Sequence, residues 1–124
     1  MTDWIRSTTE KLEDLLNLPS NWDTYNAQMI MPQAVFNARR LILCINRSQT
    51  NEPLVLPISD GSVSLEWIYG LVTLRIEIHD NGIFSAAYYS PSTEHEWSGQ
   101  LNQHIRALGQ LVSSLRDIDN DYTG

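Results

Sequence analysis

The sequence has a single cysteine among 124 residues, and its charges are unevenly divided between the two signs. One cysteine excludes an intramolecular disulfide and a zinc site built on a cysteine cluster. Eight Lys and Arg stand against fifteen Asp and Glu, which gives a formal net charge of −7 at pH 7. This excess of acid argues against direct binding to nucleic acid or to an anionic membrane, because both need aligned cations.

Long apolar runs are also missing from the sequence. No stretch approaches the ~20 apolar residues that a membrane span requires, and the first residues lack the basic and apolar segments of a signal peptide. Hydrophobic residues nonetheless make up 42% of the chain, which is enough to bury a core. We therefore expect a cytoplasmic protein that folds as a single domain over residues 1–124.

Apolar residues recur at spacings of three and four in three segments, which predicts three helices. The helices cover about residues 4–16, 32–45 and 100–118. Pro32 suits the first turn of the second helix. We expect residues 117–124 to form an acidic, frayed tail.

Between the second and third helices the apolar period changes to two, the pattern of half-buried strands. Polar and apolar residues alternate over 63–67 and 72–78, and a third strand over 83–89 follows a turn at 80–82. Residues 54–58 are expected to add an edge strand, where proline is tolerated. We predict that the inward face of the sheet carries seven apolar residues: Val63, Leu65, Trp67, Val72, Leu74, Ile76 and Ile78.

Residues 91–99 fit two different structures. Thr93-x-x-Glu96 has the spacing of a helix capping box, whereas the alternation over 94–98 is that of a strand. We favour the strand, because Gly99 would be a poor residue for a helix interior. The predicted fold is therefore α+β in the order α-α-β-β-β-(β)-α, with an antiparallel meander packed on helices.

Two segments together resemble small uncharacterised bacterial proteins. The segments are Asn21-Trp22-Asp23-Thr24-Tyr25-Asn26-Ala27, followed by Pro32, and Asp60-Gly61-Ser62-Val63-Ser64-Leu65-Glu66-Trp67. The pattern of those proteins reads Gly-Trp-Asp-x-Tyr-Gly-Ala, then Pro, then Asp-Gly-Gly-x-x-Leu-Glu-Trp, and the resemblance implies no particular activity. Asn21 and Asn26 stand where the pattern has glycine, and asparagine tolerates the left-handed backbone that glycine adopts.

Carboxylates are the candidates for acid–base chemistry. Asp23 would stand at a cleft edge between Trp22 and Tyr25, although an Asp before a helix more often accepts backbone N–H groups while the tryptophan fills the core. Glu66 and Glu77 are expected on one sheet face, where a carboxylate pair can exchange protons if the pKa of one is raised. A solvated, charged sheet face is the simpler interpretation, and we predict no catalytic residue.

We also predict neither a metal ion nor another cofactor. His79-Asp80 and Glu94-His95-Glu96 offer nitrogen and oxygen ligands, but their spacing matches no metal-binding motif. Cys44 lies in the second predicted helix, which is apolar, so we expect it to be buried rather than reactive.

Aromatic and acidic side chains point instead to a protein interface. Exposed aromatic residues anchor such interfaces, and the aromatic residues that we expect to be exposed are Tyr69, Tyr88 or Tyr89, and Trp97. Glu10, Glu13 and Asp14 on the first helix would face a basic partner, because a helix presents charge in a fixed geometry.

The leading hypothesis is a non-catalytic, acidic protein-binding module. It would be a small bacterial or phage regulator or inhibitor, of the antitoxin, immunity-protein or anti-CRISPR kind, that blocks a basic surface of its partner. Two alternatives stay open. One is a small carboxylate-dependent hydrolase, and the other is a self-associating structural protein that dimerises through the last helix.

Overall fold

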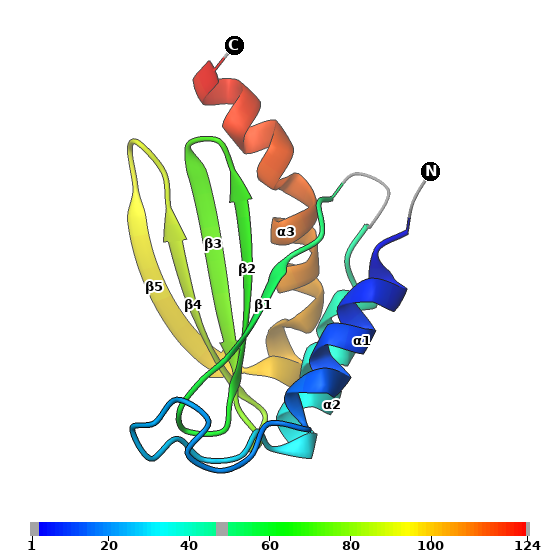
Figure 1. Cartoon of the computed structure of the whole chain (residues 1–124). Helices are drawn as coiled ribbons and strands as arrows, with labels where there is room; N and C mark the ends of the chain where they lie inside the picture. The colour runs from blue at the N-terminus through cyan, green and yellow to red at the C-terminus, as the bar shows by residue number, and fades with distance from the viewer. Residues whose placement is uncertain (1–2, 47–49, 124) are drawn as a thin grey trace.

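A computed structural model describes residues 3–46 and 50–123 of the chain. Helices α1 (Ile5–Leu15) and α2 (Pro32–Ile42) precede the strands, and α3 (Leu101–Thr123) follows them. The five strands are β1 (Leu54–Pro57), β2 (Val63–Tyr69), β3 (Val72–Ile78), β4 (Ile83–Tyr89) and β5 (Glu94–Gln100). They form one antiparallel meander in the order β1-β2-β3-β4-β5 (Figure 1). The predicted α+β fold is confirmed, and the ambiguous segment after residue 91 is a strand.

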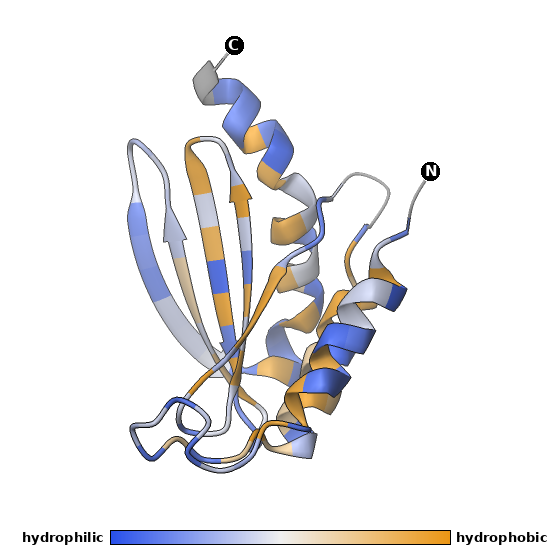
Figure 2. Ribbon diagram, viewed as in Figure 1, coloured by the Kyte–Doolittle hydropathy of each residue, from blue (hydrophilic) through white to orange (hydrophobic). Residues whose placement is uncertain are grey.

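The helices pack against one face of the sheet (Figure 1). Along β3, and along β2 as far as Trp67, the hydrophobic residues alternate with polar ones, so that the inward face is apolar (Figure 2). Ile68 breaks the alternation and is 53% exposed. All seven residues predicted to face inward are at most 1% exposed. The core therefore lies between this apolar face and the helix layer, as the two-residue period predicted.

The apolar stripe of α3 belongs to this core. Leu101, Leu108, Val112 and Leu115 are at most 2% exposed in the single chain. The stripe that a coiled-coil dimer would need is therefore occupied by the protein's own sheet and α2.

The end of α3 corrects the prediction of a frayed tail. The helix continues through residue 117 to Thr123, and Gly124 lies outside the described residues. The Asp119 carboxylate accepts a hydrogen bond from the Leu71 N–H of the β2–β3 turn, at 2.9 Å. This contact ties the last turns of the helix to the end of the sheet.

Cys44 is also placed differently from the prediction. The helical part of α2 ends at Ile42, and Cys44 lies in the following turn with an exposed side chain. The turn instead presents its backbone to α3, where Gly109 is buried. A Cβ atom on Gly109 would lie 2.5 Å from the Cys44 carbonyl oxygen, so only glycine fits at this crossing.

Candidate functional site

The face of the sheet that points away from the helices is not covered by any element within the described residues. The strand registers align its side chains in rows that cross the whole sheet. The central row consists of Leu54, Glu66, Arg75, Ala87 and Glu96, and the next row consists of Leu56, Ser64, Glu77, Ser85 and Ser98. We call this surface the open face.

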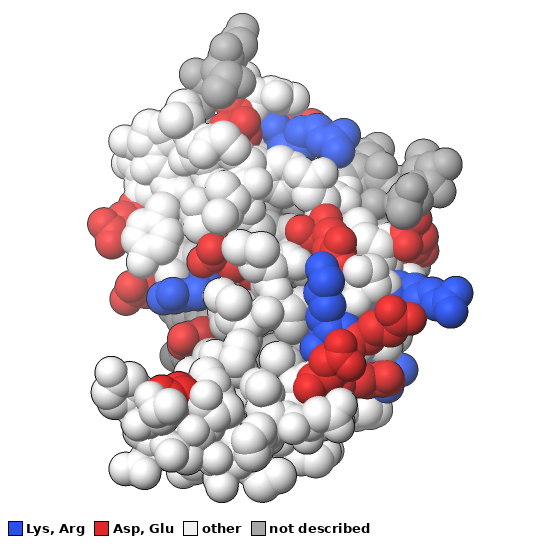
Figure 3. Space-filling view, viewed as in Figure 1, with Lys and Arg blue, Asp and Glu red and all other residues white. Residues whose placement is uncertain are grey.

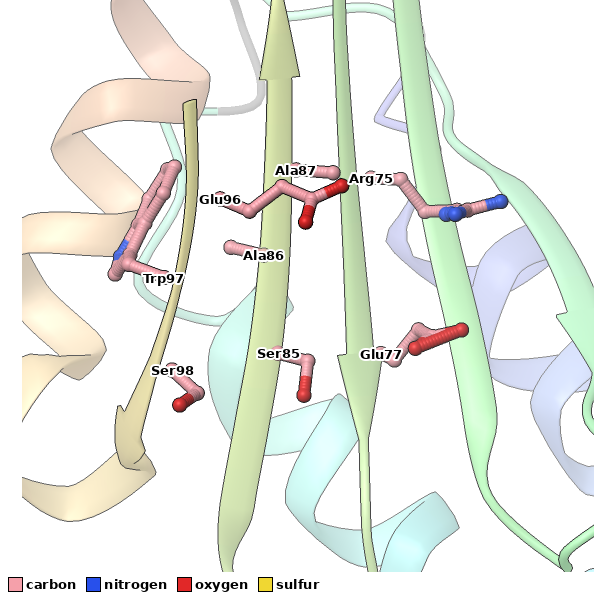
Figure 4. A pocket seen from close by; sticks show the side chains of 8 residues that line it. All are labelled: Arg75, Glu77, Ser85, Ala86, Ala87, Glu96, Trp97 and Ser98. Carbon is pink, nitrogen blue, oxygen red and sulfur yellow. The ribbon is translucent and has the colours of Figure 1, made fainter. Parts of the chain in front are cut away.

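The open face is hollowed over β3, β4 and β5, with a volume of about 370 Å³ (Figure 4). Small side chains form its floor, namely Ser85, Ala87 and Ser98, while Arg75, Glu77 and Glu96 stand around them. Trp97 also lines the hollow but turns its ring to the other side of the sheet. A shallow, polar hollow of this kind suits side chains of a partner better than an enclosed small molecule, whose sites are mostly apolar.

The charge of the open face is mainly negative. Glu66 lies directly opposite Arg75, and Glu77 lies one row further along β3. Both glutamates therefore share one face, as predicted. Two more glutamates, Glu94 and Glu96, lie exposed on the edge strand. Arg75 is the one cation that the described strands place on this face.

The acidic residues of α1 are exposed as expected, but cations neutralise much of their charge. Arg6 contacts Glu10 at 3.4 Å, and Arg39 from α2 contacts Glu13 at 3.8 Å. Figure 3 shows basic and acidic side chains interleaved over this part of the surface. Asp14 lies beside them in a hollow between α1 and α2. Because these charges largely cancel locally, α1 presents a weaker negative field than its sequence predicts.

Lys11 of the same helix makes a longer-range pair with Glu52, at 3.1 Å. Hydrogen bonds from Ser7, Lys11 and Thr8, together with the Lys11 charge, lower the pKa of Glu52 despite its partial burial. This ion pair joins α1 to the segment that leads into β1, so Lys11 stabilises the tertiary structure.

The aromatic residues expected at an interface divide into three groups. Tyr69 is 8% exposed, and its hydroxyl accepts a hydrogen bond from the Asn51 N–H, so the prediction of an exposed turn residue is corrected. Tyr88 is half-buried against the core, whereas Tyr89 lies on the open face with its hydroxyl 3.5 Å from Glu96 Oε1. Trp97 is half-buried and stacks on His95, with ring centroids 5.0 Å apart.

The segment that carries the resemblance is a tightly hydrogen-bonded loop. Asp23 Oδ1 accepts the N–H groups of Tyr25 and Ala27 at 2.8 and 3.0 Å, which confirms the structural interpretation of this carboxylate. Asn21 and Asn26 have φ values of 62° and 68°, as their glycine-like positions predicted. These contacts leave the Asp23 carboxylate engaged with the backbone.

The two aromatic residues of this loop do not form the walls of a cleft. Trp22 is half-buried outside the core and donates from Nε1 to the Gln28 carbonyl at 3.0 Å, which corrects the prediction that it fills the core. Tyr25 is 86% exposed. Trp67, from the second segment of the resemblance, is buried inside the core at 1% exposure.

Sequence reasoning missed one cluster of serine, histidine and aspartate. Ser62 Oγ lies 2.6 Å from His79 Nδ1, and Asp60 Oδ2 lies 3.7 Å from the same nitrogen. Burial alone would raise the pKa of Asp60, but hydrogen bonds from Ser62 and the charge of His79 outweigh it and lower that pKa. A catalytic triad places the serine and the carboxylate on opposite ring nitrogens. Here both lie nearest to Nδ1, so the arrangement differs from that of a catalytic triad.

The side chains that could ligate a metal are dispersed over the described residues. Among them, no three His, Cys, Asp or Glu side chains are grouped as metal ligands would be. None of the described helices combines the length and apolarity needed to cross a bilayer.

The fold and the open face thus define a small α+β domain with one uncovered, acidic sheet surface. Comparisons with protein-family models, with curated proteins and with solved structures found no match for the chain.

Proposed function

We propose that this protein is a non-catalytic binding module that recognises a basic segment of another protein on its open face. The observation that carries the proposal is the hollow over β3–β5, in which small floor residues are ringed by Glu77, Glu96 and a single Arg75. Lysine or arginine side chains of a partner would extend over this floor and meet the glutamates. Such a module fits a small regulator or inhibitor of the antitoxin, immunity-protein or anti-CRISPR kind, which occupies a basic surface of its target.

The arrangement of charge favours the open face over α1 as the binding surface. On α1, Glu10 and Glu13 already have cationic partners from the same chain. On β5, Glu94 and Glu96 are exposed, and no ion pair to them is seen in the described part of the chain. Unpaired carboxylates attract a basic partner over a Debye length, about 8–10 Å at physiological salt, and raise its association rate.

The aromatic ring of Tyr89 adds a specific contact to this electrostatic attraction. Tyr89 lies on the open face next to Glu96 and is half-buried, so a guanidinium could stack on its ring while it pairs with the carboxylate. Charge then supplies the association rate, and the aromatic contact supplies part of the residence time.

The proposal can be tested with a seven-residue peptide of alternating lysine and valine, blocked at both ends. Isothermal titration should show binding that weakens as salt rises from about 50 to 300 mM. Removing two charges from β5, in the variant Glu94→Gln/Glu96→Gln, should weaken binding about fivefold or more. The matched variant Glu10→Gln/Glu13→Gln removes the same charge from α1 and should change the affinity by less than about twofold.

Two results would overturn the proposal. One is no binding of the peptide at millimolar concentration and low salt. The other is an equal loss of affinity in both double variants, because net charge alone would then account for the binding.

A further inference from the structure

The sheet has two edges, and they differ in how well they are protected. The β1 edge is four residues long, follows the buried Pro53 and ends at Pro57, which has no N–H group to donate. The β5 edge is seven residues long, contains no proline and pairs with β4 in an unbroken register. Exposed edges of this kind are usually blocked by charged side chains, proline or a bulge. β5 has neither proline nor a bulge, and its two charged side chains are both acidic.

The backbone of β5 offers hydrogen-bonding groups at alternate residues. At the two ends of the β4–β5 ladder, Ser90 N–H donates to the Thr93 carbonyl and Leu101 N–H donates to the Gly82 carbonyl. Hydrogen-bonded and non-hydrogen-bonded pairs alternate between these ends in an antiparallel ladder. Glu94, Glu96 and Ser98 are therefore at the non-hydrogen-bonded positions, where N–H and C=O groups point outward from the sheet.

The two sides of this edge differ in chemistry. Glu94 and Glu96 project onto the open face, whereas His95 and Trp97 stack on each other on the helix side. A strand added beside β5 would therefore place alternate side chains next to carboxylates and the others next to an aromatic pair. The complementary sequence alternates cationic with apolar residues.

A second copy of this chain is a poor occupant of the same edge. In the antiparallel register that pairs the whole of β5 with its own copy, Glu94 lies opposite Gln100, and Glu96 lies opposite Ser98. The two Glu96 side chains are then diagonal neighbours on one face, where their like charges repel. Glutamates on β5 thus discourage self-association and leave the edge open to a basic strand.

We infer that β5 is a strand-addition site, at which an extended partner segment of alternating cationic and apolar residues pairs antiparallel with Glu94–Gln100. This inference rests on the proposed function and specifies how the basic partner binds. Backbone hydrogen bonds to Glu94, Glu96 and Ser98 supply much of the affinity, and the alternating side chains supply the specificity.

The test uses two N-methylated forms of the Lys–Val peptide. In the added strand, lysines that face Glu94 and Glu96 have their own N–H groups directed at β5, whereas valine N–H groups point away. Methylation of the lysine backbone amides should weaken binding about tenfold or more, because it removes the donors of the added ladder. Methylation of the valine amides preserves those donors and is expected to leave the affinity within about threefold of the parent.

A protein variant tests the same contact from the other side. Ser98→Pro removes an outward N–H and leaves the β4 ladder intact, so the fold should persist while peptide affinity falls about fivefold or more. Ser98→Ala, which keeps the outward N–H, measures how much of any loss comes from the side chain on the floor of the hollow. Should the proline variant fail to fold, amide exchange in the wild type decides: the N–H groups of Glu94, Glu96 and Ser98 should become protected when the peptide is added.

The outcomes separate the two proposals. Equal affinity of all three peptides, without amide protection on β5, overturns strand addition but leaves binding by the open face intact. Failure of the unmethylated peptide to bind overturns the proposed function itself. Protection of β5 amides that rises with protein concentration before any peptide is added would identify a second copy as the occupant, and would also overturn the inference.

Discussion

On β3 the side chains of Val72, Leu74, Ile76 and Ile78 are completely buried, while between them Thr73 and Glu77 are half-exposed and Arg75 is exposed. One strand therefore serves two surfaces of opposite character. The covered face supplies the apolar burial that drives folding, at roughly 25 cal/mol per Å². The open face contributes little to that burial, so its residues are free to be chosen for recognition.

The small residues of the open face illustrate this freedom. Ser85 and Ala87 occupy the middle of β4, where larger β-branched or aromatic residues would favour a strand more strongly. Their small volume creates the hollow between Arg75 and Glu96. β4 therefore has a low strand propensity at the two positions that form the hollow. Burial on the covered face compensates for the stability that is lost there.

The largest predicted effect tests the division between the two faces on neighbouring residues. Leu74→Ala leaves a cavity in the core and should lower the free energy of unfolding by about 2–5 kcal/mol. Thr73→Ala, one residue away on the open face, should lower it by about 1 kcal/mol or less. Urea unfolding measures both. Similar losses at the two positions would mean that the faces do not differ in their contribution to stability.

A second prediction concerns the helix layer that covers the apolar face. Gly109→Ala should destabilise the protein by about 1–3 kcal/mol, because the new methyl group would overlap the Cys44 carbonyl oxygen at the α2–α3 crossing. In an open helix the same change would stabilise by about 1 kcal/mol. Ala107→Gly, at an exposed position of α3, measures that intrinsic difference. A Gly109→Ala variant more stable than wild type would show that the crossing can move apart.

The covered face was predictable because a two-residue period assigns every second side chain to one side. The same period explains why Tyr69 is buried: β2 extends to residue 69, two residues beyond Trp67, so Tyr69 faces inward and is not a turn residue. The contact between Ser62 and His79 follows from the hairpin as well, since Val63 pairs with Ile78 and the next pair outward is Ser62 with His79. The burial of Tyr69 and the contact between Ser62 and His79 could both have been predicted by extending the β2–β3 pairing by one or two residues at each end.

Other features depend on tertiary contacts that cannot be predicted from a local sequence pattern. Arg39 from α2 neutralises Glu13 on α1, and this pairing needs the tertiary arrangement of two helices. Asp119 reaches Leu71 only because α3 runs the length of the sheet, so the helical end could not be predicted from the acidic composition of the tail. The open face was foreseen as charged, whereas its hollow depends on three strands meeting at small residues.

The smallest predicted effect concerns carboxylates at the boundary between the two faces, whose protonation at low pH lowers the stability of the fold. The inward positions of the strands carry no carboxylate, so loss of stability in acid must come from side chains at the periphery, such as Asp60 and Glu52. The pKa of each is lower in the folded protein than its usual value, 3.8 for Asp60 and 4.5 for Glu52. Between the folded and unfolded pKa values the unfolded chain binds more protons, so these contributions are present above the usual pKa and are lost as the pH falls through the folded one. The Asp60 side chain is 55% exposed, which keeps its contribution small.

Asp60→Asn should therefore flatten, slightly but measurably, the decline of the urea midpoint below about pH 5. Asp80→Asn removes the same charge from the next turn and controls for the change in net charge. If the decline stays as steep in Asp60→Asn as in the control, the hydrogen bonds from Ser62 do not contribute to the acid sensitivity of the fold, and its source lies with Glu52 or elsewhere at the margin.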